Sequence, residues 1–400
     1  MPGCGLEADM TFNPPSRPDL AIPDFGPNIG LIGVPGGRSR LATPCLVLDR
    51  ERLFRNIGRA AAHATARGIC LRPHGKSHKC ATIAKLQIAA GSKGICVATV
   101  GEAEAMARAD VNDLLITSIF TQPGKIARAV AIAGTGCRVM IVADDPGIVD
   151  AMSAAAKQAG AKFDVLIDVD LGRNRAGVTS SAQVLAVAER IAASSSLTLV
   201  GLQTYASLIS HTASYRKRVG QSAASMQLIL SIKAALENAG HVITTVTGGS
   251  TGTLFIDPEL GCYTELQPGS YVFNDVEYMG VDLDGHQGSI FEPALFVAVS
   301  IIGRNVPGRV ACDGGNKHFS AKGTLPTFEH PPAAGAVYRP DSDEHGIIDL
   351  PAGADQPTLG TEFELIVPHC DPTANLYRAY HVVEGDTLVD IWTIEARGAF

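Results

Sequence analysis

The stretch RVMIVADDPGIVDAMSAAAKQAGAKFDVLIDV, residues 138–169, shows the pattern that decides the fold. Two apolar, β-branched runs are separated there by a segment with the length and composition of a helix. The same alternation extends over about residues 44–275. The expected strands are Ile69–Arg72, Gly94–Ala98, Leu114–Ser118, Arg138–Ala143, Phe163–Val169, Leu197–Tyr205, Ile243–Thr247 and Glu265–Phe273. Eight strands with intervening helices predict a (β/α)₈ barrel, since a doubly wound sheet rarely needs so many.

After about residue 285 the pattern changes to strands without strong helices between them. These strands are expected at Phe291–Ile302, Arg309–Asp313, Phe363–Val367, Tyr380–Val383 and Leu388–Trp392. We therefore expect an extended, proline-rich N-terminal arm (1–42), a barrel (43–284) and a C-terminal all-β domain (285–400). Residues 43–48, which precede the barrel, could pair with the β-domain.

The composition argues against several classes of protein. With 33 Lys and Arg against 40 Asp and Glu, the net charge of −7 does not suit a nucleic-acid partner. No apolar run approaches the ~18 residues of a membrane span, and the first forty residues lack the features of a secretory signal. Nine cysteines, an odd number without a C-x-x-C motif, favour a reducing compartment. We expect a cytoplasmic protein that acts on a small molecule.

The first expected strand ends in RPHGKSHK, residues 72–79, which holds three cations and two histidines. Barrel active sites lie at the C-terminal ends of the strands. Neighbouring cations and partial burial lower the pKa of a lysine, as a Schiff-base lysine requires. The alternative is a solvated basic loop, and the sequence leaves both interpretations open.

A second segment, TGGSTGT at residues 247–253, follows the seventh expected strand. Its glycines and hydroxyls suit a phosphate, and barrels often bind phosphate near strands seven and eight. A glycine-rich turn without a ligand is equally compatible. The same letters satisfy G-x-S-x-G, so Ser250 could be a hydrolase nucleophile. That motif needs a helix after the turn, and LFIDP at residues 254–258 is a poor helix.

Two weaker patterns supply further ligands. In His369-Cys370-Asp371, alternation along an extended segment would bring His369 and Asp371 onto one metal ion and point Cys370 away. A surface turn capped by Asp371 is the alternative. The charged segment DVDLGRNRAG, residues 168–177, offers an arginine to a cofactor ring nitrogen or a carboxylate. A structural ion pair with a neighbouring aspartate would explain it equally well.

Taken together, these segments resemble the pyridoxal-phosphate enzyme family that contains D-threonine aldolase, D-3-hydroxyaspartate aldolase and eukaryotic-type D-serine dehydratase. The resemblance implies an alanine-racemase-like barrel with a β-domain, and it covers residues 43–398. It is carried by RPHGKSHK (72–79), GRNRAG (172–177), GGSTG (248–252), ELQPGSY (265–271), DEHG (343–346) and HCDPT (369–373).

The resemblance also implies a role for each matched residue. Lys76 would bind pyridoxal 5'-phosphate covalently, with Lys79 as the next candidate. Arg175, or Arg173 in its place, would approach the cofactor ring together with Tyr205. The phosphate would be held by Gly249, Ser250, Thr251 and Tyr271. A divalent metal, with Mn²⁺ or Mg²⁺ favoured and Zn²⁺ as an alternative, would be bound by His369 and Asp371, and His74 or His211 would act as a base. The family further implies a homodimer.

The expected reaction is cleavage of a D-β-hydroxy-α-amino acid, of the D-threonine or D-3-hydroxyaspartate type, to glycine and an aldehyde. The alternative within the family is a dehydratase, whose members characteristically present His-x-Cys. Here the residue two positions after His369 is Asp371, a hard oxygen donor that favours the aldolase. A non-catalytic cofactor carrier and a serine hydrolase using Ser250 are the more distant alternatives.

Overall fold

Eight parallel strands form one curled sheet in the computed structural model, which describes residues 26–286, 288–320 and 323–400. Along the sheet they follow the order β2-β9-β8-β7-β6-β5-β4-β3. Their bounds are β2 (Cys70–Leu71), β3 (Ile95–Val97), β4 (Asp113–Ile116), β5 (Arg138–Ala143), β6 (Phe163–Val169), β7 (Leu197–Thr204), β8 (Thr245–Gly248) and β9 (Glu265–Leu266). The two ends of the sheet meet where the N–H of Cys96 donates to Pro73 O at 2.8 Å. The predicted (β/α)₈ barrel is confirmed.

The strand positions agree with the expected ones, but the last strand is much shorter than expected. We predicted a strand over Glu265–Phe273, and β9 ends at Leu266. Pro268 cannot donate a ladder hydrogen bond, and the next residues instead form the single-turn 3₁₀ helix η6 (Ser270–Val272). This early end of β9 leaves Gly269 and Ser270 free to line a pocket.

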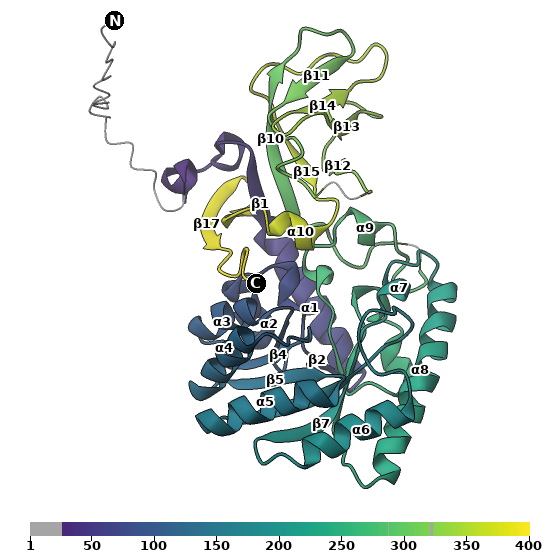
Figure 1. Cartoon of the computed structure of the whole chain (residues 1–400). Helices are drawn as coiled ribbons and strands as arrows, with labels where there is room; N and C mark the ends of the chain where they lie inside the picture. The colour runs from purple at the N-terminus through teal and green to yellow at the C-terminus, as the bar shows by residue number, and fades with distance from the viewer. Residues whose placement is uncertain (1–25, 287, 321–322) are drawn as a thin grey trace, which may run out of the picture.

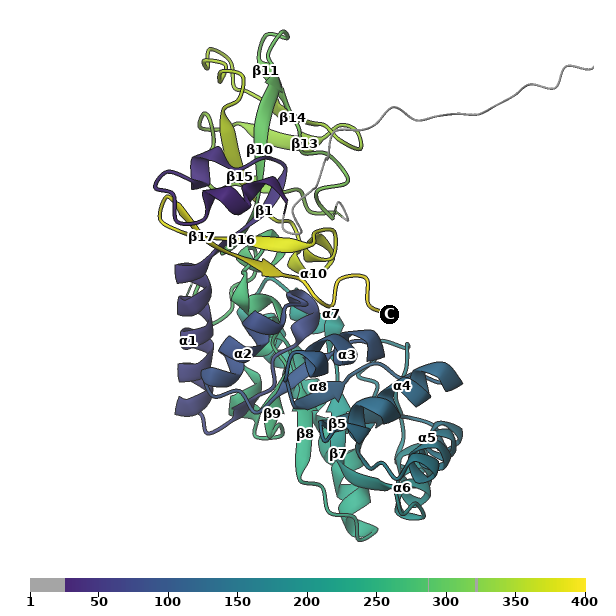
Figure 2. The same ribbon diagram turned by 90° about the vertical axis from the view of Figure 1, so that its left-hand side faces the viewer.

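Helices surround the parallel sheet, as Figures 1 and 2 show. The long ones are α1 (Arg50–Ala66), α2 (Ala81–Ala89), α3 (Val100–Arg108), α4 (Pro123–Gly134), α5 (Pro146–Ala159), α6 (Ser181–Ala192) and α8 (Tyr215–Asn238), and the short ones are α7 (Ser207–Ser210) and α9 (Val276–Met279). Several begin at residues suited to an N-cap. The Thr99 hydroxyl, for example, accepts the N–H of Glu102 at 3.1 Å at the start of α3.

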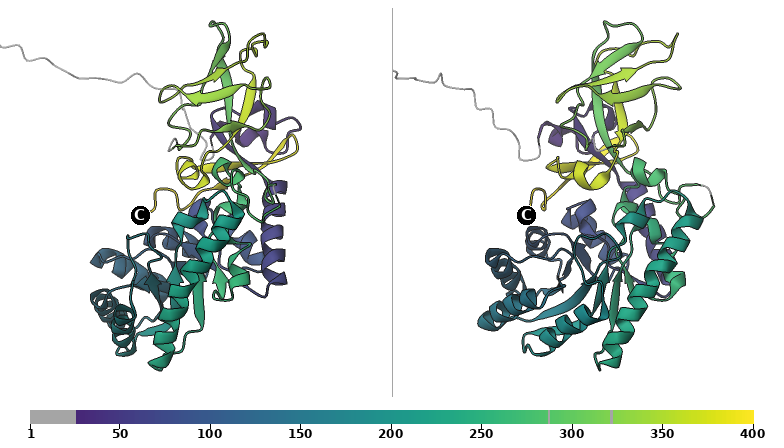
Figure 3. Two further views of the ribbon diagram at one scale, coloured as in Figure 1. Left: turned by 90° about the vertical axis from the view of Figure 1, so that its right-hand side faces the viewer. Right: turned by 45° about the vertical axis from the view of Figure 1, so that its right-hand side comes forward.

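A second, mostly antiparallel sheet of nine strands lies above the barrel (Figures 1 and 3). Its strands are β1 (Cys45–Asp49), β10 (Leu295–Gly303), β11 (Arg309–Cys312), β12 (Thr327–Phe328), β13 (Val337–Pro340), β14 (Gly346–Asp349), β15 (Glu362–Ile366), β16 (Ala379–Glu384) and β17 (Thr387–Thr393). Strand β1 pairs antiparallel with β10 and parallel with β16. The first strand of the chain therefore lies inside a sheet made otherwise of C-terminal strands.

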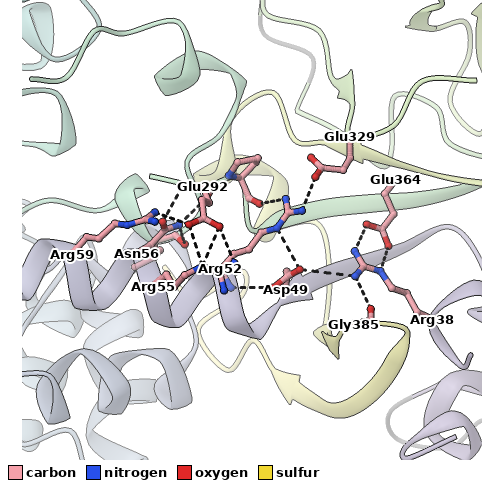
Figure 4. Close-up of polar contacts among 12 residues, drawn as sticks. Arg38, Asp49, Arg52, Arg55, Asn56, Arg59, Glu292, Glu329, Glu364 and Gly385 are labelled. Atoms are coloured by element: carbon pink, nitrogen blue, oxygen red, sulfur yellow. Dashed lines mark hydrogen bonds and ion pairs between the residues drawn. The ribbon is translucent and has the colours of Figure 1, made fainter. Parts of the chain in front are cut away.

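Helix α1 joins the two sheets. It packs against β2 and η6 of the barrel, and its arginines contact residues that flank β10 and β12 of the nine-stranded sheet (Figure 4). Arg52 pairs with Glu329 at 2.7 Å, and Arg55 pairs with Glu292 at 2.8 Å. The Asn56 side chain is buried and donates to the carbonyl of Glu292 at 2.8 Å. These contacts hold the nine-stranded sheet over the barrel.

Residues 26–42 of the expected N-terminal arm form the 3₁₀ helices η1 (Pro27–Leu31) and η2 (Arg38–Arg40), and residues 1–25 lie outside the described residues. The N–H of Gly33 donates to Leu388 O at 2.8 Å, so this part lies against β17. Over the described ranges, no helix combines the length and hydropathy that a membrane crossing needs. The eight cysteines in those ranges are free thiols.

Candidate active site

Two adjoining pockets open at the C-terminal ends of the barrel strands, below the nine-stranded sheet. Their empty volumes, which include the open solvent at their mouths, are about 440 and 570 Å³. The first pocket brings together most residues singled out from the sequence: His74, Lys76, Tyr205, His211, Gly249, Ser250, Thr251, His369 and Asp371. Arg175 lines the second pocket, and Lys76 lines both.

Lys76 lies in the single-turn 3₁₀ helix η3 (Gly75–Ser77), where the chain turns after β2. Its Nζ is 3.6 Å from Asp371 Oδ2 and 5.3 Å from the centre of the Tyr205 ring. Burial alone would lower the pKa of Lys76, but the Asp371 carboxylate outweighs it and raises that pKa above its ordinary value. We had expected a lowered pKa, so this expectation was wrong.

The neighbouring cations do not lower the pKa of Lys76, because each of them is paired with a carboxylate of its own. The Arg72 side chain is fully buried within the barrel, where it donates to Glu265 at 2.9 Å and to Asp113 at 2.5 Å. Lys79 pairs with Glu102 and has a positive φ of 53°. Lys79 is therefore engaged in a structural ion pair, which leaves Lys76 as the lysine of both pockets.

The two histidines considered as bases differ in their environment. His74 Nδ1 accepts the N–H of Lys76 at 3.4 Å, and its Nε2 is 3.1 Å from the Thr117 hydroxyl, so both ring nitrogens are occupied. Burial and the Lys76 charge hold the pKa of His74 well below its ordinary value. His211 is 41% exposed at the pocket mouth, with Nδ1 3.7 Å from Glu277 Oε2. Burial lowers the pKa of His211 too, which favours its neutral imidazole. Of the two, only His211 has a nitrogen free to exchange a proton.

The glycine-rich segment forms a tight loop that leads into the 3₁₀ helix η4 (Thr251–Thr253). A Cβ on Gly252 would lie 1.9 Å from Ser210 O, so only glycine fits there. Thr251 begins η4 and Ser270 begins η6, and within the described ranges their N–H groups find no acceptor. Two free amide donors facing one pocket suit a phosphate.

The Tyr271 hydroxyl does not reach this pocket. Tyr271 is buried and its hydroxyl accepts a hydrogen bond from Gln87 at 3.0 Å. Its backbone N–H instead donates to the Thr251 hydroxyl at 3.0 Å, so Tyr271 contributes by supporting the loop. Ser250 also lacks the surroundings of a hydrolase nucleophile, since its hydroxyl neighbours Thr253 at 3.5 Å and a three-residue 3₁₀ turn follows it.

The second pocket has the groups expected around a heteroaromatic ring. The Arg175 guanidinium lies 5.9 Å from the centre of the Tyr205 ring, whereas Arg173 is not a lining residue. Gln203 donates to Asp168 at 3.0 Å, and its Oε1 is buried without a partner among the residues that the structure describes. Burial raises the pKa of Asp168 to about 6. An unpartnered buried oxygen and a cation beside an aromatic ring fit a polar ring compound.

His369 and Asp371 lie side by side with Lys76 in the first pocket. His369 Nδ1 donates to Asp275 Oδ2 at 2.9 Å, which leaves its Nε2 available to a ligand. Burial alone would lower the pKa of His369, but the bond to Asp275 and the nearby carboxylates raise it to about 9. Burial alone would raise the pKa of Asp371, but Lys76 and His369 hold it below its ordinary value.

Cys370 does not point away as expected. We assumed an extended segment, but Cys370 begins the short helix α10 (Cys370–Ala374), so the alternation of side chains ends at His369. The thiol is fully buried, 3.3 Å from Asp371 Oδ1, and Asp275, His369 and Cys370 form a cluster of possible metal ligands. Burial raises the pKa of the Cys370 thiol well above its ordinary value.

The oxygens of Asp275, however, are already occupied. Oδ2 accepts the N–H of Cys370 at 2.8 Å as well as His369, and Oδ1 accepts the N–H of Tyr278 at 3.1 Å. Such a carboxylate orients a histidine ligand rather than binding the metal itself. Asp275 and Glu277 were not predicted from the sequence. Their acidic pair, shortly after the ELQPGSY motif, is the pattern that could have revealed them.

A further buried acid, Asp257, lies behind the glycine-rich loop of residues 248–252. A Cβ on Gly249 would lie 2.7 Å from Asp257 Oδ2. Burial raises the pKa of Asp257 to about 7, although hydrogen bonds from Thr253 and Ser222 oppose the shift. A carboxyl group with a raised pKa favours the folded state below its unfolded pKa, and this contribution disappears as the pH rises through about 7.

We therefore expect Asp257→Asn to gain stability relative to the wild type as the pH rises. Urea unfolding at pH 5 and pH 8 should show the difference in the free energy of unfolding growing by roughly 1–3 kcal/mol in favour of the variant. Glu259→Gln, at an exposed position of the same turn, should show no such growth. A pH-independent difference for Asp257→Asn would contradict the raised pKa.

Comparison with known proteins agrees with this architecture. Residues 48–276 match the alanine racemase N-terminal domain, and residues 294–383 match the putative serine dehydratase domain. A D-threonine aldolase of Arthrobacter sp is 36% identical over 360 residues, which cover 90% of this chain and 94% of the relative. A 3-hydroxy-D-aspartate aldolase of Paracoccus denitrificans is 34% identical over 365 residues, covering 90% and 93%.

A solved structure is similar as well. The crystal structure of D-threonine aldolase from Filomicrobium marinum aligns with a TM-score of 0.87 and 32% identity, covering 90% of this chain and 97% of that one. Family and fold were both predicted from the sequence motifs, and both are confirmed. The chain thus belongs to the alanine-racemase-like family that includes these D-threonine and 3-hydroxy-D-aspartate aldolases.

Proposed function

We propose that this protein is a pyridoxal-phosphate- and metal-dependent aldolase that cleaves D-β-hydroxy-α-amino acids to glycine and an aldehyde. The observation that carries the proposal is the pocket in which Lys76 lies directly beside His369 and Asp371. One amine and a two-residue metal site can then contact the same small substrate. Similarity to aldolases acting on D-threonine and 3-hydroxy-D-aspartate supports this substrate class.

Different residues of the two pockets would bind the aldehyde carbon, the phosphate and the ring of the cofactor. Lys76 would bind the aldehyde carbon, since it is the lysine shared by both pockets. Thr251 and Ser250 would hold the phosphate, and Arg175 would face the ring beside Tyr205. When bound, pyridoxal 5'-phosphate supplies a conjugated ring that accepts the electron pair released as the substrate's Cα–Cβ bond breaks.

His369 Nε2 and the Asp371 carboxylate would bind the metal, with Asp275 fixing the orientation of the imidazole. A metal site made of an imidazole and a carboxylate, without a thiolate, suits Mn²⁺ or Mg²⁺ better than Zn²⁺. When bound, the ion lowers the pKa of the substrate's β-hydroxyl. Asp371 also neutralises Lys76, so metal binding at Asp371 would release the lysine from its ion pair.

His211 is the residue that we assign to proton removal from the β-hydroxyl. Its ring lies at the mouth of the same pocket, 6.1 Å from the ring of His369. The neutral imidazole can accept the proton, and Glu277 beside it stabilises the resulting charge. His74 is not assigned this role, because both of its nitrogens are occupied by the chain.

One observation favours a second function, namely the match of residues 294–383 to the putative serine dehydratase domain. The two reactions differ in their products, which gives a direct test. Incubated with D-threonine or D-3-hydroxyaspartate, pyridoxal 5'-phosphate and Mn²⁺, the protein should release glycine and an aldehyde in equal amounts. A keto acid and ammonia as the main products would overturn the aldolase in favour of the dehydratase. L-Threonine serves as the control substrate and should remain uncleaved.

We further propose a homodimer in the cytoplasm. The free cysteines support a reducing location, and the dimer follows from the family resemblance alone. Sedimentation equilibrium gives the oligomeric state directly.

A further inference from the structure

Two arginines, Arg72 and Arg218, have no exposed surface in the described structure, and they differ in their partners. Arg72 has carboxylate partners in Glu265 and Asp113. Arg218, on helix α8, donates only to backbone carbonyls, and no carboxylate of the described residues lies within ion-pair distance of it. Buried charges in proteins are normally paired, so an arginine of this kind needs an explanation.

The carbonyls that surround Arg218 belong to three segments around the pocket. Arg218 Nε donates to Gly252 O at 2.6 Å, in the glycine-rich loop of residues 248–252. One terminal nitrogen donates to Thr212 O and Ala213 O, directly after His211, and the other donates to Asp282 O. The guanidinium therefore lies immediately behind the loop whose front residues line the pocket.

The other groups around this loop form no ion pair with Arg218. Against the larger effect of burial, the charge of the Asp282 carboxylate raises the pKa of Arg218, but this carboxylate lies beyond ion-pair distance and its Oδ1 accepts the N–H of Gly285 at 2.8 Å. Asp257 lies against Gly249 and Thr253, but burial raises its pKa to about 7, so much of it is uncharged at neutral pH. The Tyr215 ring, 5.8 Å from the guanidinium, carries no charge at that pH. Burial lowers the pKa of Arg218, which nevertheless stays a cation near neutrality. Among the described residues, the guanidinium behind the loop thus has no carboxylate paired with it.

We propose that Arg218 is the buried counter-charge for the phosphate group of the cofactor. It acts through the loop, as a positioning residue that also supplies the positive charge that a dianion requires. This inference rests on the proposed function, because it takes the anion in the pocket to be a phosphate monoester. It explains why the arginine is buried without a carboxylate, since the pairing anion arrives with the cofactor.

The test compares two ligands that differ only in the phosphate. Full-length protein freed of cofactor is titrated with pyridoxal 5'-phosphate and with pyridoxal, and binding is followed by visible absorbance. The dissociation constant of pyridoxal divided by that of pyridoxal 5'-phosphate measures the contribution of the phosphate to binding. In Arg218→Gln this ratio should fall by roughly ten- to a hundredfold, because a buried charge near the anion is lost. Arg218→Lys, which keeps the charge, should retain most of the preference despite losing contacts to the loops.

Arg216→Gln, an exposed position on the same helix, is the matched control and should leave the ratio unchanged. A purely structural role for Arg218 would weaken both ligands equally in Arg218→Gln, and that result would overturn the inference. If the wild type binds neither pyridoxal 5'-phosphate nor pyridoxal, the proposed function itself is wrong. The inference about Arg218 is then wrong as well.

If Arg218→Gln does not fold, ³¹P NMR of the wild-type holoenzyme decides the question. A nearby buried cation should keep the bound phosphate dianionic, so its chemical shift should stay constant from pH 6 to pH 9. A shift that titrates near pH 6, as in a free phosphate monoester, would overturn the assignment.

Discussion

Lys76→Ala should yield a folded protein that is colourless with pyridoxal 5'-phosphate and has lost activity by roughly a thousandfold or more. Lys76 lines both pockets, and its amine is 3.6 Å from the Asp371 carboxylate. No replacement is at hand, because Lys79 is held by Glu102. Stability should change little, since the lost ion pair is partly solvated.

The measurement is an absorption spectrum before and after borohydride reduction, followed by peptide mapping of the labelled lysine. Lys85→Ala, at an exposed position on α2, is the control and should keep both colour and activity. A Lys76→Ala protein that remains yellow and active would remove Lys76 from the site.

Removal of the metal should be nearly as damaging. EDTA should abolish cleavage without bleaching the cofactor, and Mn²⁺ or Mg²⁺ should restore it. Asp371→Ala should reproduce permanent chelation, because a single imidazole cannot hold a hard cation, and activity should fall by roughly a hundredfold or more. The glycine-rich loop proposed to hold the phosphate is made by other segments, so the visible band should persist in this variant.

Cys370→Ala provides the contrast. The buried thiol touches Asp371, so this change should cost about 1 kcal/mol of stability, yet leave metal binding and activity largely intact. Metal content by mass spectrometry and turnover with D-threonine check both variants. Loss of metal in Cys370→Ala together with its retention in Asp371→Ala would identify a thiolate site and favour the dehydratase.

The barrel could be predicted because each of its strands is a local pattern. The run at 163–169 is apolar enough to be a strand wherever it lies, and β6 has these same bounds. The local patterns gave wrong predictions where the chain turns within a few residues. Pro268 ended β9 early, and the helical turn at Cys370 changed which side chains converge.

The charges of the site were harder to foresee, because they depend on partners distant in sequence. The segment 72–79 suggested a lysine surrounded by cations. Arg72 turns into the barrel toward Glu265, whereas Lys76 meets Asp371, almost 300 residues further along the chain. Asp275 was not predicted either, since the His369 ring that it contacts lies 94 residues further along the chain. The individual roles of the site residues remain predictions that the variants above test.

The position of β1 has a consequence for how the chain acquires its structure. Asp49 of β1 pairs in register with Val383 of β16, so 334 residues separate partners in the same sheet (383 − 49). At ~5–20 residues synthesised per second, β1 waits roughly 17 to 67 s on the ribosome for that neighbour. During this interval a strand whose five residues are all buried in the folded protein has an unpaired edge, which invites association with other nascent chains. Chains that stop before β16 should therefore aggregate, even though every barrel strand is already present.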